Sequence, residues 1–98
     1  MGSVKDFLGL SEADAVLIEM KLALSRSLRE RRQQRGLPQM EFAKRLQSSQ
    51  SRVAKMEAGD PSVSMDLLVS SLLLLGASST DLAKAIRGGE KRTGPRAA

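Results

Sequence analysis

The 98-residue chain contains no cysteine and no histidine. Without thiols it can form neither a disulfide nor a thiolate metal site. The same two absences remove the commonest general base, the strongest common nucleophile and the best transition-metal ligands. The carboxylates follow none of the spacings of catalytic motifs, and no glycine-rich loop could hold a phosphate. We therefore expect no enzymatic activity, no cofactor and no metal site.

Aromatic residues are also scarce, since there is no Trp, no Tyr and only two Phe. This argues against single-stranded RNA, whose bases stack on aromatic side chains. The apolar residues are mostly Leu, Ala, Val and Met, which favours packed helices over sheet. No apolar run approaches the roughly 18 residues of a membrane span, and no secretion signal is present. We expect one small all-α domain in the cytoplasm, with no membrane association.

Positive charge is concentrated in the middle of the chain, although the net charge is only +5. Residues 26–55 contain nine basic and two acidic residues, giving +7, whereas residues 1–25 and 56–86 carry −2 and −3. A basic block between two acidic segments indicates that one face binds a polyanion. The other interpretation is an ordinary solvated helix face.

About five helices are predicted from the period of the apolar residues and from residues that favour helix ends. The first begins with a capping pair formed by Ser11 and Asp14 and ends near Gly36. The next two are short, and Ser48 or Ser49 caps the second of them. The last two begin at serine caps as well. The predicted segments are, in chain order, 11–36, 38–46, 49–58, 64–75 and one opened by a capping box at 78–81.

The segment from Phe42 to Glu57 fits a helix-turn-helix, in which two short helices bury only two or three side chains each. Ala43 lies where the helices would cross, and a larger side chain there would separate them. The remaining residues predicted to fill the angle between the helices are Phe42, Leu46, Val53 and Met56. This arrangement leaves Gln50, Ser51 and Lys55 on the outer face of the second helix of the pair.

Residues 24–75 resemble the Cro/C1-type repressors, also called the Xre family. The resemblance rests on Gly-Leu-x-Gln from Gly36, Ser-Gln-Ser-x-Val from Ser49 and Glu-x-Gly from Glu57. It implies a lambda-repressor-like helical bundle and a structural ion pair between Arg32 and Glu57. The chain departs from the family at Gln47, where the turn usually has glycine.

The resemblance also implies that the second helix of the pair lies in the major groove of double-stranded DNA. The predicted base contacts are Gln50, Ser51, Lys55 and Arg52. The predicted phosphate contacts are Gln39, Ser49, Lys44 and Arg45. The other interpretation is that these are ordinary solvent-exposed polar side chains.

The chain as a whole is similar to the small Xre-type antitoxins of the HigA kind, whose operons encode a ribonuclease toxin. This similarity implies a homodimer on a palindromic operator, repression of its own operon and binding of a ribonuclease toxin. A stand-alone or phage-type repressor would have the same helix-turn-helix. A helical protein-interaction module with no specific DNA site is a further alternative.

Four segments are expected along the chain: an N-terminal extension with the first half of the long helix (1–23), the DNA-binding core (24–76), a C-terminal helix (77–87) and a flexible basic tail (88–98).

Two helices are more apolar than usual. The run from Leu67 to Leu75 must be widely buried, and in the first helix seven of the nine residues from Val16 to Leu24 are apolar. For the first helix we expect either a subunit or partner interface, or mutual burial of the helices.

Overall fold

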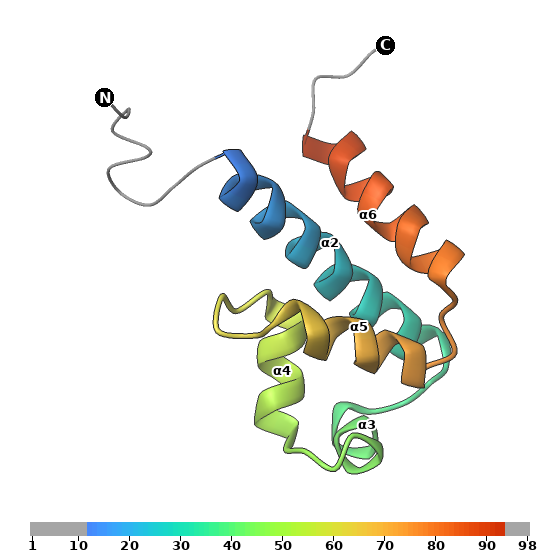
Figure 1. Cartoon of the computed structure of the whole chain (residues 1–98). Coiled ribbons are helices and arrows are strands. Elements are labelled where there is room, and N and C mark those ends of the chain that lie inside the picture. The colour runs from blue at the N-terminus through green and yellow to red at the C-terminus, as the bar shows by residue number, and fades with distance from the viewer. Residues whose placement is uncertain (1–11, 94–98) are drawn as a thin grey trace.

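The computed structural model describes the backbone of residues 12–93 and the side chains of residues 12–88. In the numbering of Figure 1, its helices are α2 Glu12–Gln34, α3 Gln39–Arg45, α4 Gln50–Ala58, α5 Met65–Leu74 and α6 Ser79–Thr93. The described residues form no strand, so the predicted all-α fold is confirmed. Over the same residues, no helix has the length and apolar character needed to span a bilayer.

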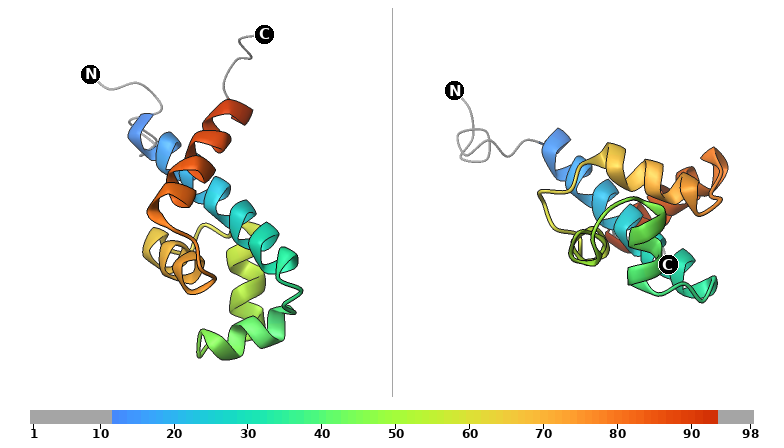
Figure 2. Two further views of the ribbon diagram at one scale, coloured as in Figure 1. Left: turned by 90° about the vertical axis from the view of Figure 1, so that its right-hand side faces the viewer. Right: turned by 90° about the horizontal axis from the view of Figure 1, so that it is seen from below.

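The long helix α2 is the centre of the fold. It contacts α4, α5 and α6, and α3 packs on α4. α6 returns along α2 in the opposite direction, so that its end lies near the beginning of α2 (Figure 1). α3 and α4 lie toward the C-terminal half of α2, away from that end of the molecule (Figure 2). The two short helices α3 and α4 are thus held near the C-terminal end of α2.

Serine side chains begin three of the helices, as predicted. Ser49 accepts a hydrogen bond from the backbone N–H of Arg52 at 3.1 Å, which decides the N-cap of α4 in favour of Ser49 over Ser48. Ser64 accepts from the N–H of Leu67 at 3.1 Å. The capping box before α6 is reciprocal, with 2.8 Å from the Ser78 N–H to Asp81 Oδ2 and 3.1 Å from the Asp81 N–H to Ser78 Oγ. These bonds satisfy N–H groups that have no partner inside the helix.

The structure corrects several predicted boundaries. Pro38 is the N-cap of α3 and has an extended backbone, with φ −64° and ψ 156°, so it precedes the helix that we expected it to begin. α6 continues to Thr93, beyond residue 87, where the tail was expected to begin. A glycine inside a helix costs only about 1 kcal/mol relative to alanine, so Gly88 and Gly89 do not end it. Ser11 and residues 94–98, which belong to the predicted cap and tail, lie outside the described residues.

The hydrophobic core joins α2 to the helix-turn-helix and to α5. Its largest fully buried apolar side chains are Leu24, Leu28, Phe42, Val53, Met56, Leu68 and Leu72. Phe42, Ala43, Val53 and Met56 are buried as predicted, and Leu46 packs against the same cluster while remaining partly exposed. Burial of the 67–75 run is less complete than expected, because Leu73 and Leu74 are each 50% exposed.

The N-terminus of α6 is also tied to α2 by charge. Asp81 Oδ2 lies 3.5 Å from Nη2 of Arg31. Hydrogen bonds from Ser78, together with Arg31 and Lys84, lower the pKa of Asp81 below its ordinary value. Because the folded-state pKa is the lower one, the ionised carboxylate stabilises the fold near neutral pH, and this contribution is lost as the pH falls through that pKa.

The first prediction concerns this carboxylate. At pH 7 we expect Asp81→Asn to have a smaller free energy of unfolding than the parent protein. The difference should shrink as the pH falls below about 3.9, the ordinary aspartate pKa, and disappear in stronger acid. Urea denaturation of both proteins between pH 7 and pH 2.5 measures this. A difference that is the same at both ends of the range would contradict the assignment.

Candidate nucleic-acid interface

The helix α4 has one buried side and one open side. Val53 and Met56 are 0% and 1% exposed and face the core. The opposite side presents Gln50, Ser51 and Lys55, all of which are exposed. Arg52 is exposed as well. α4 therefore offers polar and basic side chains to any molecule that approaches its outer face.

Gly59 ends α4 and holds it close to α2. Its φ of +77° lies in the left-handed region, which glycine adopts without strain. A Cβ atom at this position would come within 2.6 Å of Cδ2 of Leu22. The position therefore requires glycine both for the backbone conformation and for the space between the two helices. Gln47, in the turn between α3 and α4, has a φ of 54° without being glycine, which is the departure seen in the sequence.

Arg32 and Glu57 form a two-point ion pair that links α2 to the end of α4. Arg32 donates from Nε to Oε2 of Glu57 and from Nη2 to Oε1, the latter at 3.0 Å. The two side chains are only 11% and 4% exposed. The hydrogen bonds to Glu57 raise the pKa of Arg32, despite the opposing effect of burial. This is the pair that the family resemblance implied.

Two further hydrogen bonds extend the pair to the rest of the helix-turn-helix. Nη1 of Arg32 donates to the carbonyl oxygen of Leu37 at 2.7 Å, which fixes the connection between α2 and α3. Nε2 of Gln39, the first residue of α3, donates to Oε1 of Glu57 at 3.1 Å. The side chain of Glu57 is therefore held from α2 and from α3 at once. We call the four residues Arg32, Leu37, Gln39 and Glu57 the Glu57 network.

The predicted phosphate-contacting residues lie in two kinds of environment. Lys44 and Arg45 are exposed at the end of α3, and Nζ of Lys44 lies 3.6 Å from Oε2 of Glu41. Ser49 is exposed, and its hydroxyl oxygen also caps α4. Gln39 is partly buried and bound to Glu57. The amide nitrogen of Gln39 has a second N–H, which is free to donate a hydrogen bond to a phosphate oxygen.

A hollow of about 270 Å³ lies along the flank of α4 that faces α2. Its lining combines the polar members of the Glu57 network with one exposed arginine and two alanines of α4: Arg29, Arg32, Gln39, Ala54, Glu57 and Ala58. The charge of Glu57 is neutralised by Arg32, which leaves the positive charge of Arg29. The flank is therefore open and has no net negative charge.

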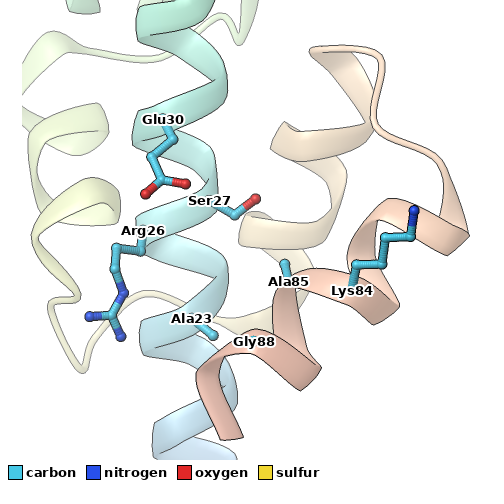
Figure 3. A pocket seen from close by; sticks show the side chains of 7 residues that line it. All are labelled: Ala23, Arg26, Ser27, Glu30, Lys84, Ala85 and Gly88. Atoms are coloured by element: carbon cyan, nitrogen blue, oxygen red, sulfur yellow. The ribbon is translucent and has the colours of Figure 1, made fainter. Parts of the chain in front are cut away.

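A second hollow, of about 180 Å³, lies between α2 and α6. Figure 3 shows the small side chains Ala23, Ser27 and Ala85 along it, while Arg26 and Lys84 extend away from it. The charges around it are of both signs. Among the described residues there is also no group of acidic, histidine or cysteine side chains that could hold a metal ion. This hollow lies where small side chains of α2 and α6 face each other. Its lining does not suggest a binding site.

Residues 23–85, more than half of the chain, match the family described as the helix-turn-helix domain. The chain belongs to this family. Its helix-turn-helix domain is of the Xre/Cro-like type and is characteristic of DNA-binding regulators. Neither a curated protein nor a solved structure is significantly similar to the chain.

Some features of this helix-turn-helix protein were not foreseen from its sequence. The bond between Gln39 and Glu57 joins residues 18 positions apart, and no spacing rule connects them. Two serines, Ser25 and Ser71, are buried at 3% and 0% exposure. The hydroxyl of Ser71 donates to the sulfur of Met56 at 3.9 Å. Serine is usually exposed, so composition alone gives no signal for such positions.

The second prediction concerns the buried pair. Arg32→Met leaves the Glu57 carboxylate buried without its cation, and we expect a loss of about 3–5 kcal/mol in the free energy of unfolding. The double variant Arg32→Met/Glu57→Met removes both charges and should lose less than the sum of the single variants. Urea denaturation of the four proteins measures the coupling.

Arg26→Met is the matched control, because Arg26 is an exposed arginine of the same helix. It should change the free energy of unfolding by less than about 0.5 kcal/mol. Additive losses in the double variant would show that the two charges do not depend on each other, contrary to the structure.

Proposed function

We propose that this helix-turn-helix protein is a sequence-specific transcriptional regulator that binds double-stranded DNA with α4 in the major groove. The observation that carries the proposal is the outer face of α4, where Gln50, Ser51 and Lys55 are exposed together on a short helix braced by the Glu57 network. A recognition helix must combine exposed readers with a fixed orientation.

The proposed readers have suitable chemistry for base edges. Gln50 can bind adenine through two hydrogen bonds, Ser51 can donate or accept, and Lys55 can donate to guanine. Arg52 is exposed on the same helix and completes the proposed set of base contacts. Gln50 is the first residue of α4, so the readers begin where the helix would enter the groove.

Phosphates would be bound on both sides of the readers. Lys44 and Arg45 at the end of α3 supply positive charge, while Gln39 and Ser49 supply neutral hydrogen-bonding groups. Arg31 is paired with Asp81, and Arg32 is paired with Glu57. These two arginines therefore add less positive charge to the proposed DNA surface than the sequence alone suggests.

We further propose that the protein acts as a homodimeric repressor on a palindromic operator. Four aliphatic side chains of α2, Val16, Leu17, Ile18 and Leu22, are between 41% and 50% exposed. Packing among the described residues therefore leaves this part of α2 open, which favours the interface over mutual burial. A two-fold dimer would place its two recognition helices about 34 Å apart along the DNA.

The biological role that best fits the sequence is that of a cytoplasmic antitoxin that represses its own operon and binds a ribonuclease toxin. This part of the proposal rests on the similarity to HigA-type antitoxins together with the open face of α2. A stand-alone or phage-type repressor has the same DNA-binding half. A toxin-sized reading frame next to the gene, whose product co-purifies with this protein, would separate the two roles.

The third prediction tests the readers. After selection of bound sequences from random double-stranded DNA, Lys55→Ala should lose preference at one base pair of the selected site, at a cost of about 1–3 kcal/mol there. Arg45→Ala should weaken binding to all sequences similarly and reduce the slope of log K against log salt by about 1. Selection and binding titrations at several salt concentrations measure both effects.

A base preference that is unchanged in Lys55→Ala would contradict the assignment of this reader. If the parent protein binds selected and random DNA equally at physiological salt, the regulator proposal fails. The basic block would then favour the alternative of a helical module that binds an acidic protein.

A further inference from the structure

We infer that Ala54 is the point of closest approach between α4 and the DNA, and that its methyl group contacts the 5-methyl group of a thymine. The inference rests on the proposed function and names a specificity-determining residue that the sequence reading did not include. Its basis is the position of a small, exposed, apolar side chain among the proposed readers.

Helical geometry places Ala54 between the proposed base-contacting residues Gln50, Ser51 and Lys55. It lies four residues after Gln50 and three after Ser51, so both are its neighbours on the helix surface. Lys55 follows it directly, and the exposed Ala58 lies one turn beyond. If the long side chains of Gln50 and Lys55 reach base edges, the helix surface between them must lie against the floor of the groove.

The size of Ala54 decides how near the helix can come. Ala54 is exposed, and the described residues leave a hollow of about 270 Å³ beside Ala54 and Ala58. A larger residue at position 54 would fill the space and hold the helix away from the bases. Among the described residues that line the hollow, Ala54 and Ala58 are apolar and the others are charged or polar.

The methyl group of Ala54 determines which base it can contact favourably. In the major groove, only thymine presents an apolar group, its 5-methyl, while the other bases present donors and acceptors. An alanine cannot satisfy a base donor or acceptor, so a polar base edge facing it would lose its water without replacement. Thymine is therefore the base that Ala54 favours, and we expect one such thymine in each half-site.

Deoxyuridine tests this contact, because it lacks only the 5-methyl group of thymidine. Each thymine of the selected operator is replaced in turn, and the dissociation constant is measured for the parent protein and for Ala54→Gly. At one thymine per half-site the parent should lose about four-fold in affinity, the value for one buried methyl group. Ala54→Gly should bind the thymine and uracil forms of that site equally.

Size is tested separately with Ala54→Leu, which keeps good helix propensity. We expect a loss of at least about ten-fold on the operator, because the helix can no longer approach the bases. The matched control is Ala83→Leu, an exposed alanine of α6, which packs on α2. It should change affinity by less than about two-fold. Ala54→Ser, which keeps the size but adds a hydroxyl, serves as a second small variant if Ala54→Gly is poorly folded.

The outcomes separate this inference from the function on which it rests. If the parent protein selects an operator but no thymine shows a uracil effect that vanishes in Ala54→Gly or Ala54→Ser, the inference is overturned and the regulator proposal stands. Unchanged affinity of Ala54→Leu would also overturn it. If the parent selects no sequence, the proposed function fails, and this inference fails with it.

Discussion

The structure depends on the bidentate contact between Arg32 and Glu57. The pair joins the end of α2 to the end of α4, and both side chains are largely buried. Because Glu57 also accepts from Gln39, the same carboxylate fixes the start of α3. Helices of seven and nine residues are too short to be stable alone, so α3 and α4 depend on their contacts with the core and with this polar network.

The supporting helix α2 divides the protein into surfaces of different character. Its C-terminal half carries the arginines and the contact to α4, while its N-terminal half exposes aliphatic residues. α6 packs along α2 and is held at its start by Asp81 and Arg31. If the proposed DNA surface and the proposed dimer interface are correct, the rigid helix α2 couples assembly of subunits to the spacing of their α4 helices.

Much of the fold could be predicted from residues whose local chemistry is decisive. Ser49, Ser64 and the Ser78–Asp81 box were recognisable because a short side chain that accepts from the backbone has few other uses before an apolar run. Buried residues of the helix-turn-helix followed from helical period. The predicted end of α6 was wrong because glycine weakens a helix without necessarily ending it.

The candidate site was less predictable, for a physical reason. Long-range contacts such as Gln39 to Glu57, or Leu22 against Gly59, depend on how helices cross, which no local pattern records. The network could be expected only in part, through the family resemblance that pairs Arg32 with Glu57. Ala54 was overlooked because alanine carries no polar group, and the role that we propose for it depends on the neighbours that surround it.

The central claim is that the outer face of α4 is the surface that meets DNA. An NMR titration of the isotope-labelled protein with a selected duplex tests it most directly. We expect the largest amide shifts on residues 49–55 and on the start of α3, with small shifts in α6. Shifts concentrated in α6 or in the N-terminal half of α2, with α4 unchanged, would contradict it.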